Sequence, residues 1–325
     1  MSATRERKSG APGSHPEASE KRRRWLRPGM FPYLLLIPAV VFELLIHIVP
    51  MVFGVVISFL KLTALYIRNW SQAPFVGFEN FKIGLDPHGA IGSALAHSFL
   101  ITLAYTVLVV AGSWVFGVAA ALLVNSEFRG RGWFRTLFLI PYTLPIYVAV
   151  IAWEFMLQQN TGSVNTLLVN DLHVLKNPPF WLIGSKAFWS LVMTALWRSW
   201  PFAFLLILAA LQNISQDLYE AAAVDGASKW RQFRSITLPQ IRPVSVVVVL
   251  VLFLWTFNDF NTPYILFGQA PPGAADLLSL HIYINSFVDL NFGLGAAMST
   301  LLLLFLFIVS IVYVRLLRVG SEENA

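Results

Sequence analysis

Long apolar runs, separated by short polar segments, extend through most of the sequence. A helix rises about 1.5 Å per residue, so it needs about 20 residues to cross a hydrocarbon layer about 30 Å thick. Six of the apolar runs are at least this long. Continuous runs favour helices over membrane-spanning strands, which alternate apolar and polar residues in segments of about 10. The sequence therefore predicts an all-α, polytopic membrane protein with six transmembrane helices. The predicted spans are Phe31–Leu60, His97–Asn125, Trp133–Leu157, Ala187–Leu211, Val244–Phe267 and Ala296–Leu316.

The composition supports a membrane protein and excludes several kinds of functional site. Of 325 residues, 57% are hydrophobic and 12% are charged, whereas a soluble domain carries about 25% charged residues. Cysteine is absent, which excludes disulfides, cysteine-ligated zinc, iron–sulfur clusters and a thiol nucleophile. The motifs G-x-x-x-x-G-K-[ST], H-E-x-x-H and G-x-S-x-G are also absent. We therefore predict no catalytic residue, no metal site and no cofactor bound by this chain.

Basic residues predict the orientation in the membrane. With the N-terminus in the cytoplasm, 17 of the 23 Lys and Arg residues fall in inside segments, 5 fall outside, and Arg198 lies within a span. This asymmetry obeys the positive-inside rule, so both termini are predicted to be cytoplasmic. The predicted parts are a disordered basic tail (1–29), a six-helix transmembrane domain (30–318) and a C-terminal tail (319–325). A nucleic-acid role for the basic tail is the less favoured interpretation, because a topology signal accounts for its charge.

The predicted cytoplasmic loop between spans four and five, residues 211–243, contains signals for two short helices. Glu220 and the three alanines after it are strong helix formers. Side-chain oxygens favour the first position of a helix, and glycine favours the position after its end. The predicted signals are a cap at Ser215 or Asp217, a break at Gly226, a second cap at Ser228 and a stop at Leu238 and Pro239. Taken alone, these signals also fit a loop that merely joins two spans.

The same loop resembles the signature of permease subunits in binding-protein-dependent ABC importers. The sequence reads E-A-A, three residues, Gly, nine residues and then I-x-L-P. The resemblance implies that this segment is a coupling helix that docks on a separate ATPase subunit. The implied coupling residues are Glu220, Ala221, Ala222, Asp225, Gly226, Ile236, Leu238 and Pro239.

The resemblance covers about residues 30–318 and is strongest to the first permease subunit of the maltose and glycerol-phosphate branch. It includes FVGFENF at Phe75–Phe81, FRTLFLIPYTLP at Phe134–Pro145 and NDFNTPYILF at Asn258–Phe267. Gly268–Pro271 departs from it, because relatives usually read G-G-P there, and this leaves the substrate in doubt. The resemblance implies the type I ABC importer permease fold in a bacterial or archaeal cell membrane. The implied partners are a second permease, an ATPase dimer that uses ATP–Mg, an extracytoplasmic binding protein, a sugar substrate and the lipid bilayer, but no nucleic acid.

Polar residues within the predicted spans are candidates for a substrate pathway. Arg198 lies near the middle of span four, where a charge costs about 2.5–3.5 kcal/mol unless it faces a cavity or a partner. Either an ion pair with Asp259 or Glu154, or a place in the pathway, would explain it. Pro263 is predicted to disturb the helix in span five. The candidate pathway residues are Arg198, Trp255, Asn258, Asp259, Asn261 and Tyr264; polar bonding between helices is the alternative explanation.

Three other functions remain as alternatives at this stage. The same importer class could carry glycerol-3-phosphate or a phosphodiester, which a basic pathway residue would favour. A secondary transporter or channel working alone would leave the E-A-A loop without an explanation. A membrane enzyme is disfavoured, because no loop carries a paired carboxylate and histidine motif.

Overall fold

The computed structural model of the protein describes residues 31–322, and its regular secondary structure there is helical. Within that range no strand forms, and one isolated bridge joins Leu60 to Phe75. The predicted all-α class is therefore confirmed. The predicted basic tail, residues 1–29, lies outside the described residues. The final helix runs to Glu322, so the first part of the predicted C-terminal tail is helical.

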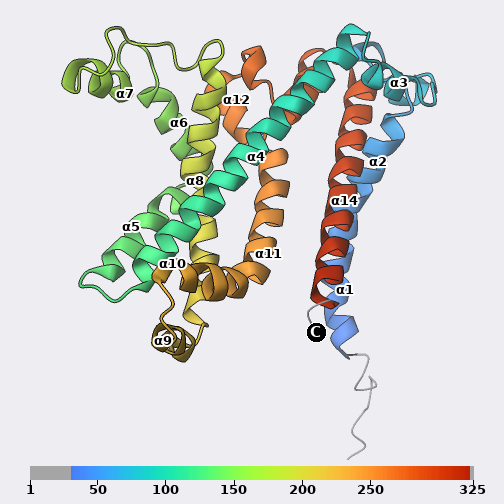
Figure 1. Cartoon of the computed structure of the whole chain (residues 1–325). Helices are drawn as coiled ribbons and strands as arrows, with labels where there is room; N and C mark the ends of the chain where they lie inside the picture. Colours follow the sequence, from blue (N-terminus) through green and yellow to red (C-terminus); the bar gives the residue numbers. More distant parts are fainter. Residues whose placement is uncertain (1–30, 323–325) are drawn as a thin grey trace, which may run out of the picture. The chain divides into compact units, whose positions relative to one another are not determined.

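Fourteen α-helices make up this part of the chain (Figure 1). They are α1 (Phe31–Glu43), α2 (Val49–Ile57), α3 (Glu79–Leu85), α4 (Ala90–Asn125), α5 (Arg131–Thr143), α6 (Ile146–Met156), α7 (Ser163–Asn165), α8 (Lys186–Gln212), α9 (Gln216–Val224), α10 (Lys229–Gln232), α11 (Leu238–Phe257), α12 (Asn261–Phe267), α13 (Leu278–Tyr283) and α14 (Phe292–Glu322). Wider π turns occur at Leu44–Ile48, Thr166–Asp171, Phe233–Thr237 and Ile284–Val288. Tighter 3₁₀ turns occur at Ala64–Tyr66, Trp70–Gln72 and Gly273–Ala275.

The chain divides into two units, the first of which ends at Val52. Its described part consists of α1, one π turn and the start of α2. The described side chains of this unit, from Tyr33 onward, are exposed, and most of them are apolar. Such a helix requires hydrocarbon or another apolar surface around it. This agrees with the predicted first span, and Tyr33–Ile57 is long and apolar enough to cross a membrane.

The second unit, Phe53–Ala325, is built around α4, which packs along α8 and α11 (Figure 1). Its largest core cluster includes Phe204, Ile207, Ile241 and Val248, all fully buried. Small residues let α4 and α8 approach closely, because a side chain on Gly117 would fall 2.7 Å from the Cβ of Ala203. Because glycine has no side chain, the two helix backbones pack directly against each other at this point, as is common between membrane helices.

Replacing Gly117 with alanine should destabilise the protein by about 1–3 kcal/mol, which is typical of an overpacked core. The new methyl group would also fall 2.8 Å from the backbone nitrogen of Phe204, which cannot rotate away. Thermal unfolding of the detergent-solubilised protein measures the effect. Gly132→Ala is the matched control, because nothing lies within 4 Å of the added Cβ. An unchanged melting temperature in the Gly117 variant would contradict this account of the α4–α8 contact.

The number of spans agrees with the prediction, but two spans are interrupted. Five helical segments in the described chain are long and apolar enough to cross a membrane. A sixth span requires counting α5 and α6 together, although they meet at an angle of 90°. The break falls at Leu144 and Pro145, and Pro145 precedes the first residue of α6. The predicted third span, Trp133–Leu157, is therefore broken near its middle, because proline restricts the preceding residue to extended backbone.

Candidate functional site

Two helices of the loop begin at the predicted capping residues. Ser215 caps α9, since its hydroxyl accepts a hydrogen bond from the backbone nitrogen of Asp217 at 3.3 Å. Ser228 caps α10 by accepting from the backbone nitrogen of Arg231 at 3.3 Å. Each cap satisfies one of the free backbone N–H groups at a helix start. The two predicted helix starts are confirmed, and Ser215 rather than Asp217 provides the first cap.

The turn between α9 and α10 depends on glycine. Gly226 has φ of +78°, in the left-handed region. Its backbone nitrogen donates to the carbonyl oxygen of Ala223 at 3.0 Å, and the nitrogen of Ala227 donates to that of Ala222 at 2.8 Å. This pair of bonds is a Schellman motif, which satisfies carbonyl groups at the end of a helix. The predicted break at Gly226 is confirmed, and its cause is the backbone angle rather than space, since nothing lies within 4 Å of an added Cβ.

Side chains on the inner side hold the loop in place, and others are left exposed. The hydroxyl oxygens of Tyr219 and Thr237 lie 2.9 Å apart, and Gln232 Nε2 donates to the carbonyl oxygen of Ala227 at 3.2 Å. Tyr219 and Gln232 were not among the predicted site residues, because their partners follow from the folded arrangement. The exposed face carries Leu218, Glu220, Ala221, Ala223, Val224 and Trp230. Val224 is 88% exposed and Trp230 is 69% exposed, which makes this a free apolar surface on the described chain.

The predicted helix stop at Leu238 and Pro239 is wrong. The helical course continues from α10 through the π turn Phe233–Thr237 into α11, and Pro239 stands in the first turn of α11. Proline is compatible with that position, where a backbone N–H is not required. Leu238 packs against the core cluster instead, Ile236 is partly buried, and Pro239 is exposed. The signature therefore divides into an exposed part on α9 and a part around the start of α11 in which Ile236 and Leu238 are partly buried.

A cavity of about 350 Å³ lies where α11 ends, and it collects most of the predicted pathway residues. Arg198, Trp255, Asn258, Asp259 and Asn261 all line it. Residues of α4, α5, α6, α8, α11 and α12 contribute, so the site is assembled from distant parts of the sequence. Tyr264 is absent from the lining. Its ring stacks instead on Phe260, with the ring centres 5.0 Å apart.

Asp259 stabilises the non-helical break between α11 and α12 with two hydrogen bonds. Its Oδ2 accepts from the hydroxyl of Tyr105 at 2.8 Å, and its Oδ1 accepts from the backbone nitrogen of Thr262 at 3.1 Å. The break thus falls at 258–260, before Pro263, which sits in the first turn of α12. The predicted span through Phe267 is interrupted there, and Pro263 is not its cause. Because both carboxylate oxygens have protein partners, Asp259 acts as a positioning residue.

Arg198 lines the cavity without an ion pair in the described part of the chain. Neither Asp259 nor Glu154 lies within 4.0 Å of its guanidinium group, so the predicted ion pair is not formed. Its side chain is partly exposed. A charge in a span is tolerated when it faces a polar or water-filled space. The cavity is therefore what accommodates Arg198 in α8.

Aromatic rings form much of the remaining wall. Trp255 is 55% exposed, and its ring centre lies 5.0 Å from that of Phe202. Tyr142 follows at 5.9 Å from Phe202. Asn261 accepts a long hydrogen bond of 3.4 Å from the Tyr147 hydroxyl. Exposed ring faces beside amide groups can stack on an apolar surface and hydrogen-bond to hydroxyls at the same time.

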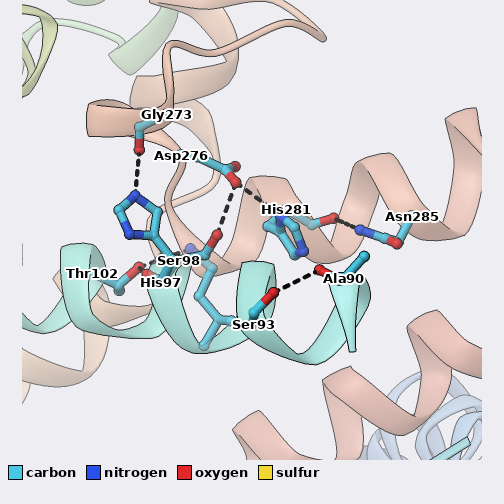
Figure 2. A network of polar contacts seen from close by, with 10 residues as sticks. Ala90, Ser93, His97, Ser98, Thr102, Gly273, Asp276, His281 and Asn285 are labelled. Atoms are coloured by element: carbon cyan, nitrogen blue, oxygen red, sulfur yellow. Dashed lines mark hydrogen bonds and ion pairs between the residues drawn. The ribbon is translucent and has the colours of Figure 1, made fainter. Parts of the chain in front are cut away.

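A polar network fastens the connection between α12 and α13 to α4 (Figure 2). Asp276 Oδ2 accepts from the Ser98 hydroxyl at 2.8 Å and lies 2.8 Å from His281 Nδ1. Thr102 Oγ1 accepts from the backbone nitrogen of Leu278 at 2.8 Å. His97 Nε2 lies 3.2 Å from the carbonyl oxygen beyond α12, at Gly273. Across residues 31–322, no group of three or more His, Asp and Glu side chains is placed to hold a metal ion.

Comparison with known proteins gives consistent similarities. The family model described as "Binding-protein-dependent transport system inner membrane component" matches residues 113–318. The "Inner membrane ABC transporter permease protein YcjO" of Escherichia coli is 38% identical over 80% of this chain and 85% of its own. The "Trehalose/maltose transport system permease protein MalF" of Thermococcus litoralis is 32% identical over 88% of this chain and 93% of its own.

A solved structure shares the fold. It is a chain of a bacterial ABC transporter described as involved in the import of the acidic polysaccharide alginate. The two chains superpose with a TM-score of 0.71 at 20% sequence identity, over 91% of this chain and 96% of the other. The predicted type I importer permease fold is thereby confirmed.

Proposed function

Because the chain belongs to the family of inner membrane components of binding-protein-dependent transport systems, we propose that it forms half of the pathway of an ATP-driven sugar importer. The family match covers residues 113–318, which include the loop and every residue that lines the cavity except Tyr105. The chain is accordingly a multi-pass membrane protein and a transport subunit. The proposed substrate class is a sugar or oligosaccharide, supported by the relative named for trehalose and maltose transport.

The cavity is the observation that carries the proposed substrate class. Asn258 and Asn261 place amide groups beside the exposed ring of Trp255. A saccharide offers apolar C–H faces for ring stacking and hydroxyl groups for amides, so both kinds of lining are used. Neither a tightly apolar ligand nor a hydrated metal ion would use both. The break between α11 and α12 leaves polar groups of the backbone and of side chains free to face the cavity. Interrupted helices serve the same purpose in other transporters.

The exposed face of α9 and α10 is the proposed docking surface for a separate ATPase. It presents Glu220, Ala221 and Val224 on a helix fixed at both ends by a cap and a Schellman motif. Because bending or fraying of α9 would break these bonds, the helix can move as one rigid piece when a bound partner moves. ATP–Mg would be bound by the partner, since no nucleotide-binding motif occurs in the sequence.

The remaining assignments follow from the same proposal. A second permease completes the pathway, an ATPase dimer binds the two loops, and an extracytoplasmic binding protein delivers the substrate. Both termini are cytoplasmic, as the distribution of basic residues predicts. The test is reconstitution of the chain with its genomically neighbouring permease, ATPase and binding protein in liposomes. ATP-dependent uptake of a labelled maltodextrin or disaccharide supports the proposal, whereas uptake by this chain alone contradicts it.

Asn258→Ala should raise the substrate concentration for half-maximal uptake about five- to tenfold, because one hydrogen bond of about 1–1.5 kcal/mol is lost. Its side chain is exposed in the cavity, and its internal contact is a 3.4 Å bond from the Ser279 hydroxyl. Initial uptake rates over a range of saccharide concentrations measure the effect. Ser279→Ala is the control that removes the internal contact alone. Equal half-saturation values in wild type and Asn258→Ala would remove Asn258 from the pathway.

A negatively charged substrate is the second candidate, and Arg198 favours it. The guanidinium group lines the cavity without a carboxylate within 4.0 Å, within the described chain. It could bind the phosphate of glycerol-3-phosphate or of a phosphodiester bidentately. Arg198→Gln distinguishes the two candidates. Uptake of a neutral saccharide should survive it, whereas uptake of a phosphorylated substrate should fall to background.

A further inference from the structure

A second cavity, of about 470 Å³, lies among α3, α4, α13 and α14, apart from the proposed pathway. All the residues that line it are apolar, including glycine and proline. The side chains used below are Leu95, Ala96, Phe99, Leu100, Leu302 and Phe305. Water inside such a space would find no polar partner, so it is unsuited to hydration. The groove requires an apolar occupant.

The position of the groove identifies the kind of occupant. Its long walls are residues 92–100 near the start of α4 and residues 298–305 in the N-terminal half of α14, and both helices are candidate membrane spans. Leu100 is 61% exposed and continues the wall outward, and Leu303 and Leu304 on α14 are also exposed. The groove is therefore continuous with the apolar face that a multi-pass protein presents to hydrocarbon. By the predicted orientation, these helix ends lie toward the extracytoplasmic leaflet.

We propose that this groove binds one acyl chain of a membrane glycerophospholipid. A hydrocarbon chain matches a lining of apolar side chains. Because the chain would come from an equally apolar bilayer, packing contacts in the concave groove, and not removal from water, would hold it there. The proposal goes beyond the transport function, because it requires neither a sugar nor an ATPase.

The bound chain would contact the residues that fix the end of α11. Phe99 and Phe305 line the groove and flank Phe257, with ring centres 5.7 Å and 4.9 Å from it. Phe257 is fully buried and is the last residue of α11, directly before Asn258. An acyl chain that supports these rings would support the helix end that borders the pathway cavity. Lipid occupancy is expected to influence the geometry of that cavity.

The test uses the assembled importer in nanodiscs containing phospholipid with a photoreactive group midway along one acyl chain. Illumination followed by peptide mass spectrometry is expected to place cross-links at residues 92–100 and 298–305. Leu302→Trp fills the groove and should remove most of this labelling, because the indole ring occupies the space of the acyl chain. Leu304→Trp is the matched control, since Leu304 is 50% exposed on the same helix and does not line the groove.

A second variant separates lipid exclusion from disturbed folding. Ala96→Leu enters the groove from α4, at an exposed position, and should also lower labelling while the melting temperature stays at the wild-type value. Equal labelling in Leu302→Trp, Ala96→Leu and the control would overturn the proposal. Lipid labelling confined to a second permease or to residues 31–52, and absent from residues 92–100 and 298–305, would overturn it as well.

Discussion

Replacing Gly226 with valine should abolish ATP-driven uptake by the reconstituted importer, although the chain still inserts into the membrane. The residue has φ of +78°, and a side chain costs about 1–2 kcal/mol in the left-handed region, with a further penalty for β-branching. Relief of this strain would break the bonds that end α9, those to the carbonyl oxygens of Ala222 and Ala223. The proposed docking helix would then lose its fixed orientation.

Three measurements check this result, namely uptake into proteoliposomes, substrate-stimulated ATP hydrolysis, and retention of the ATPase on the purified permease. Gly226→Asn is the matched control, because asparagine tolerates the left-handed region better than other residues. It should retain most of the uptake. If valine at position 226 supported uptake equal to that of asparagine, the turn would not be needed for coupling.

Asp259→Leu should also abolish uptake, and it should lower the melting temperature. The substitution leaves the Tyr105 hydroxyl, on a fully buried residue, and the backbone nitrogen of Thr262 without partners. Each unsatisfied buried group costs about 1–3 kcal/mol. The start of α12 would lose its cap, and the break that borders the cavity would change shape. Uptake rate and thermal unfolding of the same preparation measure the two effects.

Two further variants identify the cause. Asp259→Asn keeps a carbonyl oxygen for Thr262 and a polar group for Tyr105, so it should retain substantial uptake and a near-normal melting temperature. Tyr105→Phe removes the hydroxyl together with its need for a partner, and it should cost only about 0.5–1.5 kcal/mol. A total loss of uptake in Asp259→Asn, at normal stability, would indicate instead that the carboxylate binds substrate directly.

Much of the fold could be predicted from the sequence, because a membrane span is a local property of about 20 apolar residues. The interruptions within spans could not. Pro239 and Pro263 were expected to disturb helices, but each occupies a first turn, where proline fits. The break before α12 depends instead on Tyr105, which is 154 residues away from its partner Asp259. A single sequence does not reveal such a long-range bond.

The predicted cytoplasmic loop and the cavity also differ in how far the sequence predicts them. The caps at Ser215 and Ser228 and the glycine turn join residues a few positions apart, so local rules identify them. The cavity brings Arg198 of α8 together with α11 and α12, and the sequence indicated only that a charge in a span needs a polar environment. It did not indicate that Arg198 would form no ion pair with a carboxylate of residues 31–322, or that the ring of Tyr264 would stack on Phe260.

The bonds from α4 to both ends of the segment 259–278, which contains α12, have a mechanical consequence. Tyr105 holds Asp259 ahead of α12, and Ser98 and Thr102 hold Asp276 and Leu278 beyond it. A short segment tied at both ends to one 36-residue helix moves with that helix as a rigid body. The wall of the proposed pathway cavity would therefore keep its shape while the transporter alternates between its two open states. Opening and closing of the pathway would then depend on the contacts between α4 and the helices around it. The selectivity of the cavity and the access to it could therefore vary independently.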